Sequence, residues 1–178
     1  MSDRIISCDI DGVLADGVYV PPEKRNVAGM SGLAVADPLA PYYLSGLCHR
    51  SLVYLLSSRA WPGALYGTQL WLRKRYFDDS QLAGIICNIS TNNKLQVATL
   101  LGATYHIDDD PEIVLCYNGT GTLPLLLYNP HRPLPLVQHN HFFPTWEHLA
   151  DWLCRKDALA SVAPQQPPSA TSAKGQNK

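Results

Sequence analysis

The residues of this chain that are best suited to chemistry are aspartates at the ends of short apolar runs. The run Arg4–Cys8 leads into Asp9 and Asp11, and Gly12 follows at once. A second acidic group, Asp108–Asp110, follows a later apolar run. Carboxylates held close together repel one another strongly unless a cation lies between them. A hard divalent ion with oxygen ligands meets that need, so we predict that the first pair and one or two residues of the second group bind Mg²⁺.

Two further polar residues could complete a site for a phosphoryl group. Ser57 ends the apolar run Leu52–Leu56, and Lys94 begins the helical pattern before the second acidic group. Taken singly, the serine could be a helix cap and the lysine a solvated surface cation. Together with the metal ion they would bind the oxygens of a phosphoryl group, and Asp9 would be positioned to attack it.

The segments that must hold these residues alternate between strands and helices. The predicted strands are Arg4–Cys8, Leu52–Leu56, Gly84–Ile89, Thr104–Ile107 and Leu123–Tyr128. The predicted helices are Ala64–Phe77, Lys94–Leu101, a short one that starts at Pro111, and one that Thr145 caps. This order predicts an α/β fold with a doubly wound parallel sheet of about five strands. Ligands of such sheets bind beyond the carboxyl ends of the strands, where Asp9, Ser57 and Asp108 fall.

Two segments do not follow this alternation. Asp16–Gly46 is rich in proline and glycine, which predicts a loop excursion with little regular structure. It leaves directly after the paired aspartates, where a flap over the substrate would sit. Asp157–Lys178 contains prolines and no aromatic residue, so it is predicted to be a disordered tail. We therefore expect one domain over residues 1–156, with the flap at about 16–46, and a tail over 157–178.

The composition limits the classes of function. A net charge of −1 argues against a protein whose main task is to hold long nucleic acid. The five cysteines are scattered and lack a CxxC pair, which favours reduced thiols in a cytoplasmic protein over a disulfide framework or a zinc site. No signal peptide is evident, and no run approaches the roughly 20 apolar residues of a membrane helix, so no membrane partner is expected.

The order DIDGV, strand-end serine, lysine and IDDD resembles the four motifs of the haloacid dehalogenase (HAD) superfamily of phosphatases, over residues 4–115. The resemblance implies that Asp9 is the nucleophile that forms an aspartyl-phosphate. It implies that Asp11 protonates the leaving oxygen and then activates water. Ser57 and Lys94 would hold the phosphoryl oxygens. The implied ligands of Mg²⁺ are the Asp9 carboxylate, the Asp11 carbonyl, Asp108 and, directly or through a neighbour, Asp109.

Two groups within that superfamily resemble the chain more closely. The string DGVLAD is similar to the pyrimidine 5′-deoxyribonucleotidases (type C), which implies a mononucleotide substrate. The insert Val13–Arg50 is shorter than the helical cap of those enzymes and is more similar to the 3′-phosphatase domain of polynucleotide kinases. That domain has a similar strand-end serine motif, so Ser58 and Arg59 become further candidates for contacts with the substrate phosphate. It also has a basic aromatic helix, here WLRKRYF.

The sequence thus predicts a Mg²⁺-dependent phosphomonoester hydrolase that acts on a small molecule, most simply a 5′(3′)-deoxyribonucleotidase-like nucleotide phosphatase. The alternative is a polynucleotide 3′-phosphatase that processes nucleic-acid ends. A non-catalytic binding module of the same fold would be expected to lack Asp9, Asp11 or Asp108, and all three are present. The sequence leaves open hydrolysis against phosphotransfer and the oligomeric state.

Overall fold

The computed structural model describes residues 4–16, 23, 25–76, 79–115, 121–132 and 141–162. Their centre is a six-stranded sheet in the order β3-β2-β1-β4-β5-β6, in which every pair is parallel. The strands are β1 Ile5–Asp9, β2 Leu52–Leu56, β3 Gly84–Ile86, β4 Tyr105–Asp108, β5 Leu123–Leu127 and β6 Phe142–Phe143. The helices are α1 Val27–Ser31, α2 Ala40–Cys48, α3 Ala64–Arg75, α4 Thr91–Leu100, α5 Glu112–Leu115 and α6 Trp146–Val162, with a short 3₁₀ helix, η2, at Asp79–Gln81.

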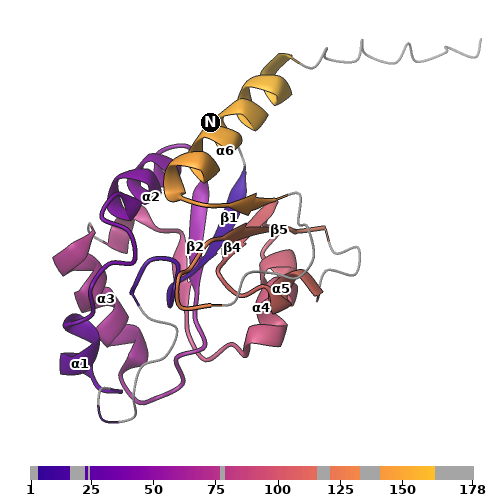
Figure 1. Ribbon diagram of the computed structural model, residues 1–178. Helices are drawn as coiled ribbons and strands as arrows, with labels where there is room; N and C mark the ends of the chain where they lie inside the picture. The colour runs from indigo at the N-terminus through magenta and orange to yellow at the C-terminus, as the bar shows by residue number, and fades with distance from the viewer. Residues whose placement is uncertain are drawn as a thin grey trace, which may run out of the picture.

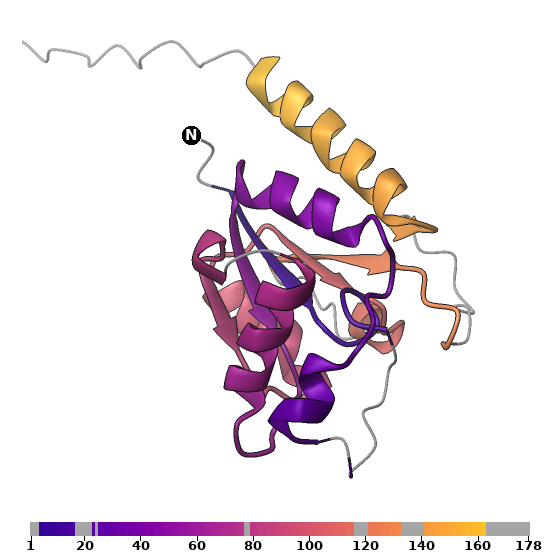
Figure 2. The same cartoon turned by 90° about the vertical axis from the view of Figure 1, so that its left-hand side faces the viewer.

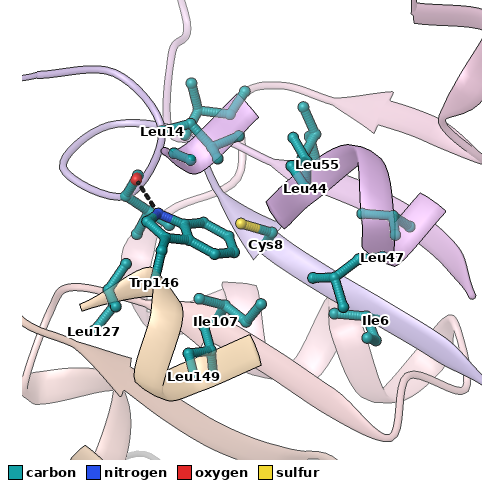
Figure 3. Packing of buried hydrophobic residues seen from close by; sticks show 14 of the residues in the cluster. Ile6, Cys8, Leu14, Leu44, Leu47, Leu55, Ile107, Leu127, Trp146 and Leu149 are labelled. Atoms are coloured by element: carbon teal, nitrogen blue, oxygen red, sulfur yellow. Dashed lines mark hydrogen bonds between the residues drawn. The ribbon is translucent and has the colours of Figure 1, made fainter. Parts of the chain in front are cut away.

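The sheet is covered by helices on both faces, as predicted. Figure 1 shows α2 and α3 on one side of the sheet and α4 and α5 on the other, and Figure 2 shows α2 beside α6. Alternate residues of each strand point to opposite faces. In β1, Ile6 and Cys8 therefore join the core under α2, α3 and α6, whereas Ile5 packs toward α4. Figure 3 shows the core under α2, α3 and α6, with Cys8 and Trp146 among its residues.

The sheet has one strand more than the predicted number of about five. The extra strand, β6, is only two residues long and pairs with β5 through Leu126 and Phe142. Two residues carry no detectable alternation of apolar and polar side chains, so their strand character comes from pairing with a neighbour. The predicted fold class is confirmed.

The segment Asp16–Gly46 is more regular than predicted, because it contains α1 and the first turns of α2. Pro41 lies in the first turn of α2, where the missing N–H is not needed, so this proline starts a helix rather than breaking one. Helix α2 is part of the core and not of a flap, since Ala40, Leu44 and Leu47 are buried. Residues 17–22 and 24 of the proposed flap lie outside the described residues.

The C-terminal helix is also longer than expected. Helix α6 continues to Val162, past the start of the tail that was predicted at Asp157. The rest of the predicted tail, residues 163–178, lies outside the described residues. Within the described part of the chain, no helix is both long enough and apolar enough to cross a membrane.

Candidate active site

The candidate site lies at the carboxyl edge of the three adjacent strands β2, β1 and β4 (Figure 1). Asp9 is the last residue of β1, Asp108 is the last residue of β4, and Ser57 directly follows β2. The register pairs Cys8 with Ile107 and Asp9 with Leu56. Parallel pairing therefore brings these side chains together from three distant parts of the sequence.

Lys94 links the two central carboxylates. Its side chain comes from the start of α4, and its Nζ lies 2.5 Å from Asp9 Oδ2 and 3.3 Å from Asp108 Oδ2. All three side chains are almost completely buried. Burial alone would lower the pKa of Lys94, but the attraction of both carboxylates outweighs it and raises that pKa. The lysine therefore stays charged and offsets part of the local negative charge.

The two carboxylates that Lys94 contacts differ in their ease of ionisation. Burial, and then the charge of Asp108, raise the pKa of Asp9 well above its usual value despite the nearby ammonium. Burial acts in the same direction on Asp108, but Lys94 and a hydrogen bond from His106 outweigh it and lower the pKa of Asp108. The single ammonium of Lys94 therefore does not fully offset the negative charge of ionised Asp9.

The acidic cluster has the features of a site for a hard cation. Asp9, Asp108 and Asp109 each offer a carboxylate oxygen, and these oxygens lie within 4.8 Å of one another. Oδ1 of Asp9 and Oδ1 of Asp109 are buried without a hydrogen-bond partner. Buried oxygens of this kind are costly unless something compensates them. An ion that prefers oxygen ligands, such as Mg²⁺, would satisfy both, so the donor set fits the metal that the sequence predicted.

Asp109 is held by residues that the sequence analysis did not identify. Asn129 Nδ2 donates to Asp109 Oδ2 at 2.6 Å, and Arg132 Nε donates to the same oxygen at 2.9 Å. Arg132 also forms an ion pair with Asp110 at 2.9 Å. These contacts occupy one oxygen of Asp109 and leave Oδ1 for a metal ion. Their place in the sequence was the one sign of this role. Asn129 and Arg132 closely follow β5, the strand that pairs with β4.

Gly12 is required by a close approach of side chains as well as by backbone geometry. Its φ of 91° lies in the left-handed region, which favours glycine. A Cβ atom at this position would overlap Asp109 Oδ2 and would lie 2.6 Å from Asn129 Nδ2. The glycine after the paired aspartates therefore lets the second acidic group reach the loop that follows β1.

We expect Gly12→Ala to lower the free energy of unfolding by at least about 1 kcal/mol, because of strain at positive φ and displacement of Asp109. It should also weaken Mg²⁺ binding. Thermal unfolding and titration of Mg²⁺ followed by calorimetry test both effects. Gly121→Ala is the matched control, since a Cβ at Gly121 meets no atom within 4 Å. Equal effects of the two substitutions would contradict this role of Gly12.

Asp11 is held by Arg59, outside the carboxylate cluster. The guanidinium contacts both carboxylate oxygens, with Nη2 2.5 Å from Oδ1 and Nε 2.9 Å from Oδ2. Arg59 is buried and is fixed in turn by Nη1, which donates to Thr68 of α3 at 2.8 Å. Arg59 is thus paired with Asp11, and its predicted contact with a substrate phosphate stays a prediction. Metal binding by Asp11 was predicted through its backbone carbonyl, and it stays a prediction.

The two serines after β2 differ in exposure. Ser57 is fully buried, and its Oγ accepts a hydrogen bond from the Arg59 backbone N–H at 3.2 Å. Ser58 is exposed. Their predicted contacts with a substrate phosphate remain predictions. Ser57 follows β2 and lies next to the end of β1, the strand that carries Asp9, which is the side of the sheet where such a contact would form.

A buried histidine supports Asp108 from inside the sheet. His106 Nε2 lies 3.2 Å from Asp108 Oδ2, and His106 Nδ1 lies 2.9 Å from Ser7 Oγ. Ser7 and His106 face each other in the register of β1 and β4, and both are fully buried. Sequence reasoning missed this pair. The alternation of side chains along a strand could have indicated it. Ser7 lies on the same face of β1 as Asp9, and His106 lies on the same face of β4 as Asp108.

Aromatic side chains fix the loop that follows β1. Trp146 Nε1 donates to the carbonyl of Val13 at 3.1 Å, the hydrogen bond drawn in Figure 3, and Tyr76 Oη donates to the carbonyl of Leu14 at 2.6 Å. Val13, Leu14 and Ala15 are fully buried. The backbone that carries Asp11 and Gly12 is therefore anchored to α6 and to the end of α3.

No model of a protein family and no curated protein sequence matches the chain. Solved structures do match. A chain of the Pnkp1/Rnl/Hen1 RNA repair complex aligns with a TM-score of 0.53 and 17% identity over 72% of this chain, which spans 43% of that chain's length. D,D-heptose 1,7-bisphosphate phosphatase from Burkholderia thailandensis aligns with a TM-score of 0.55 and 12% identity, over 85% of this chain and 99% of that one. At these identities the likeness concerns the fold alone: the chain shares the fold of these two structures, one of which is a phosphatase, and this agrees with the resemblance that the sequence motifs predicted.

Proposed function

We propose that the chain is a Mg²⁺-dependent phosphomonoester hydrolase in which Asp9 is the nucleophile. The observation that carries this proposal is the buried cluster of Asp9, Asp108 and Asp109, with two unpartnered oxygens and with Lys94 between Asp9 and Asp108. An apolar core would stabilise the fold better than a cluster of this charge, so the cluster points to a function. At the carboxyl edge of a parallel sheet, it is suited to hold a metal ion and a phosphoryl group.

Asp9, Asp108 and Asp109 would hold the metal ion. When bound, Mg²⁺ would offset the charge of the carboxylates and of the transferring phosphoryl oxygens. An oxygen of Asp9 then forms a bond to phosphorus while the bond to the leaving oxygen breaks, and Asp11 supplies the proton that this oxygen takes up. Water next attacks the phosphorus of the aspartyl-phosphate and gives its proton to Asp11, while the bond between phosphorus and the Asp9 oxygen breaks and phosphate is released. Ser57 and Lys94 hold the phosphoryl oxygens during both steps.

The contact of Asp11 with Arg59 bears on this sequence of steps. A carboxyl group that donates a proton to the leaving oxygen must turn toward it, so Asp11 has to exchange at least one contact with the guanidinium for a contact with substrate. Arg59 remains fixed by Thr68 during that exchange. It therefore provides a defined position to which Asp11 returns.

For the substrate we propose a nucleotide, because the string DGVLAD is similar to the pyrimidine 5′-deoxyribonucleotidases. The alternative, a polynucleotide 3′-phosphatase, is supported by the likeness to a chain of an RNA repair complex. The basic residues of WLRKRYF give that alternative little support. They occupy the last turn of α3, about 15 Å along the helix from its start, and Arg73 forms an ion pair with Asp79 at 2.9 Å.

A screen of phosphate release over 5′- and 3′-deoxynucleotides, 3′-phosphorylated oligonucleotides and a small alkyl phosphate tests these proposals. We expect release from deoxynucleoside 5′-monophosphates, loss of all release when Mg²⁺ is chelated, and recovery when Mg²⁺ is restored. The KM should depend only mildly on salt, because one phosphate is contacted. Preference for the oligonucleotide that disappears between low and moderate salt would favour the alternative. Absence of release from every substrate would favour a non-catalytic binding module.

A further inference from the structure

Two cavities border the candidate site in the described part of the chain. The first, which we call the Trp61 cavity, has a volume of about 390 Å³. It lies between the loop after β2, the start of α3 and the loop after β3. Its walls include Arg59, Trp61, Leu65, Tyr66, Gln69 and Asn88. The second, which we call the Trp146 cavity, has a volume of about 210 Å³; its walls include Gly12, Asp16, Asp37, Tyr128, Asn129 and Trp146.

The two cavities differ in charge. The Trp146 cavity carries the carboxylates of Asp16 and Asp37. The described residues that line the Trp61 cavity include no carboxylate, and the charge of Arg59, which also lines it, is offset by its ion pair with Asp11. Helix α3, which forms one wall, has no acidic residue in its first turn. The phosphate of an approaching phosphomonoester is anionic, so it meets less electrostatic repulsion from the lining of the Trp61 cavity than from that of the Trp146 cavity.

The cavities also differ in how they meet the reacting groups. Arg59 both lines the Trp61 cavity and holds Asp11, the residue that we propose protonates the leaving oxygen. The leaving group must lie within reach of Asp11 when the bond to phosphorus breaks. The Trp146 cavity instead meets the site at Gly12 and Asn129, beside Asp109. Position therefore favours the Trp61 cavity for the leaving group.

The walls of the Trp61 cavity are suited to a flat ring with hydrogen-bonding edges. Tyr66 is 57% exposed, and Trp61 beside it is half-buried. The indole N–H of Trp61 is buried without an acceptor, which favours an occupant that carries acceptor atoms. Gln69 and Asn88 also line the cavity, and the Gln69 amide is held by a hydrogen bond of 2.9 Å that its Nε2 donates to Asp79. A nucleobase combines a flat π-face with ring and carbonyl acceptors.

We propose that the Trp61 cavity binds the nucleobase of a nucleotide substrate, with Tyr66 and Trp61 as the residues that determine this preference. The proposal rests on the proposed function, because it places the leaving group of that reaction. Stacking of a base on an aromatic side chain changes affinity by roughly fivefold to a hundredfold. The cavity would therefore separate nucleotides from phosphomonoesters that have no ring.

The test compares Tyr66→Ala with Tyr128→Ala. Both tyrosines are exposed, at 57% and 42%, but Tyr128 lines the Trp146 cavity. The substrates are a deoxynucleoside 5′-monophosphate and glycerol phosphate, which has no ring. We expect Tyr66→Ala to raise the KM for the nucleotide about fivefold or more with little change in kcat, and to leave glycerol phosphate unaffected. Tyr128→Ala should change neither KM.

Binding of the same nucleotide to Asp9→Asn, measured by calorimetry with and without Tyr66→Ala, separates this inference from the proposed function. Loss of affinity with Tyr66→Ala in that background supports the cavity assignment even where wild-type protein releases no phosphate. Three results would overturn the assignment. They are an unchanged affinity for the nucleotide in Tyr66→Ala, a larger loss in Tyr128→Ala than in Tyr66→Ala, and an equal rise of KM for glycerol phosphate.

Discussion

Replacement of Asp9 by asparagine should lower phosphate release by about a thousandfold or more, because the residues of such a site act as a unit. Asparagine keeps the shape of the side chain but is neutral and a poor nucleophile. It also removes one of the two carboxylates that Lys94 contacts and one of the three that would hold Mg²⁺. The measurement is the initial rate of phosphate release from a deoxynucleotide and from an aryl phosphate, at saturating Mg²⁺.

The matched control is Asp151→Asn, the same chemical change on the exposed side of α6. It should leave the rate unchanged. Wild-type protein that is quenched with acid during turnover should carry a phosphoryl group on the peptide that contains Asp9, and the Asp9→Asn variant should carry none. A variant that keeps more than about a tenth of the wild-type rate would show that covalent catalysis by Asp9 is wrong.

The groups that gather at the carboxyl edge of the sheet were predictable because parallel strands follow a simple rule. Once β1, β2 and β4 are recognised as buried strands, their carboxyl ends must lie at the same edge. Asp9, Ser57 and Asp108 then fall close together without any knowledge of side-chain positions. The structure adds the contacts themselves, such as the bridge that Lys94 forms between Asp9 and Asp108.

The supporting residues were not predictable in this way, because their roles depend on register. His106 supports Asp108 since it faces Ser7 across the β1–β4 pair, and a shift by one residue would turn it to the other face. Asn129 and Arg132 reach Asp109 from the residues that follow β5, and they do so only because β5 pairs with β4. The sequence shows Gly12 directly after the paired aspartates, but the close approach of Asp109 to it arises only in the folded chain.

The regular structure within Asp16–Gly46 was missed because its helices are stabilised mainly by tertiary packing. Helix α1 has five residues, too few to be stable alone. It packs on α3, where a Cβ on Gly63 or Gly67 would lie 3.2 or 3.1 Å from side-chain atoms of Val27 or Met30. Gly63 and Gly67, which lie outside the predicted loop, allow this close contact, and Pro41, which helped to predict the loop, starts α2 instead.

The second large effect is expected from Asp11→Asn, which should lower turnover by about a hundredfold to ten-thousandfold and leave the affinity for Mg²⁺ unchanged. The proposed proton donor is lost, but the carboxylates of Asp9, Asp108 and Asp109 are untouched. An asparagine can still accept a hydrogen bond from Arg59, so the loop should keep its position. Asp109→Asn should instead weaken Mg²⁺ binding by about tenfold or more, because it removes a carboxylate with an unpartnered buried oxygen.

Calorimetric titration of Mg²⁺ into Asp11→Asn and Asp109→Asn, without substrate, measures metal binding independently of catalysis. It therefore separates the proton-transfer role of Asp11 from the metal-binding role of Asp109. The comparison is matched, since each variant exchanges one aspartate for asparagine at the same edge of the sheet. Equal loss of metal affinity in the two variants would contradict the separation of Asp11 from the metal cluster. If Asp11→Asn kept full turnover, the proton would have to come from another group, and the geometry offers no equivalent carboxyl group beside Arg59 among the described residues. A loss of turnover in Asp11→Asn with intact metal binding therefore supports proton transfer by Asp11 directly.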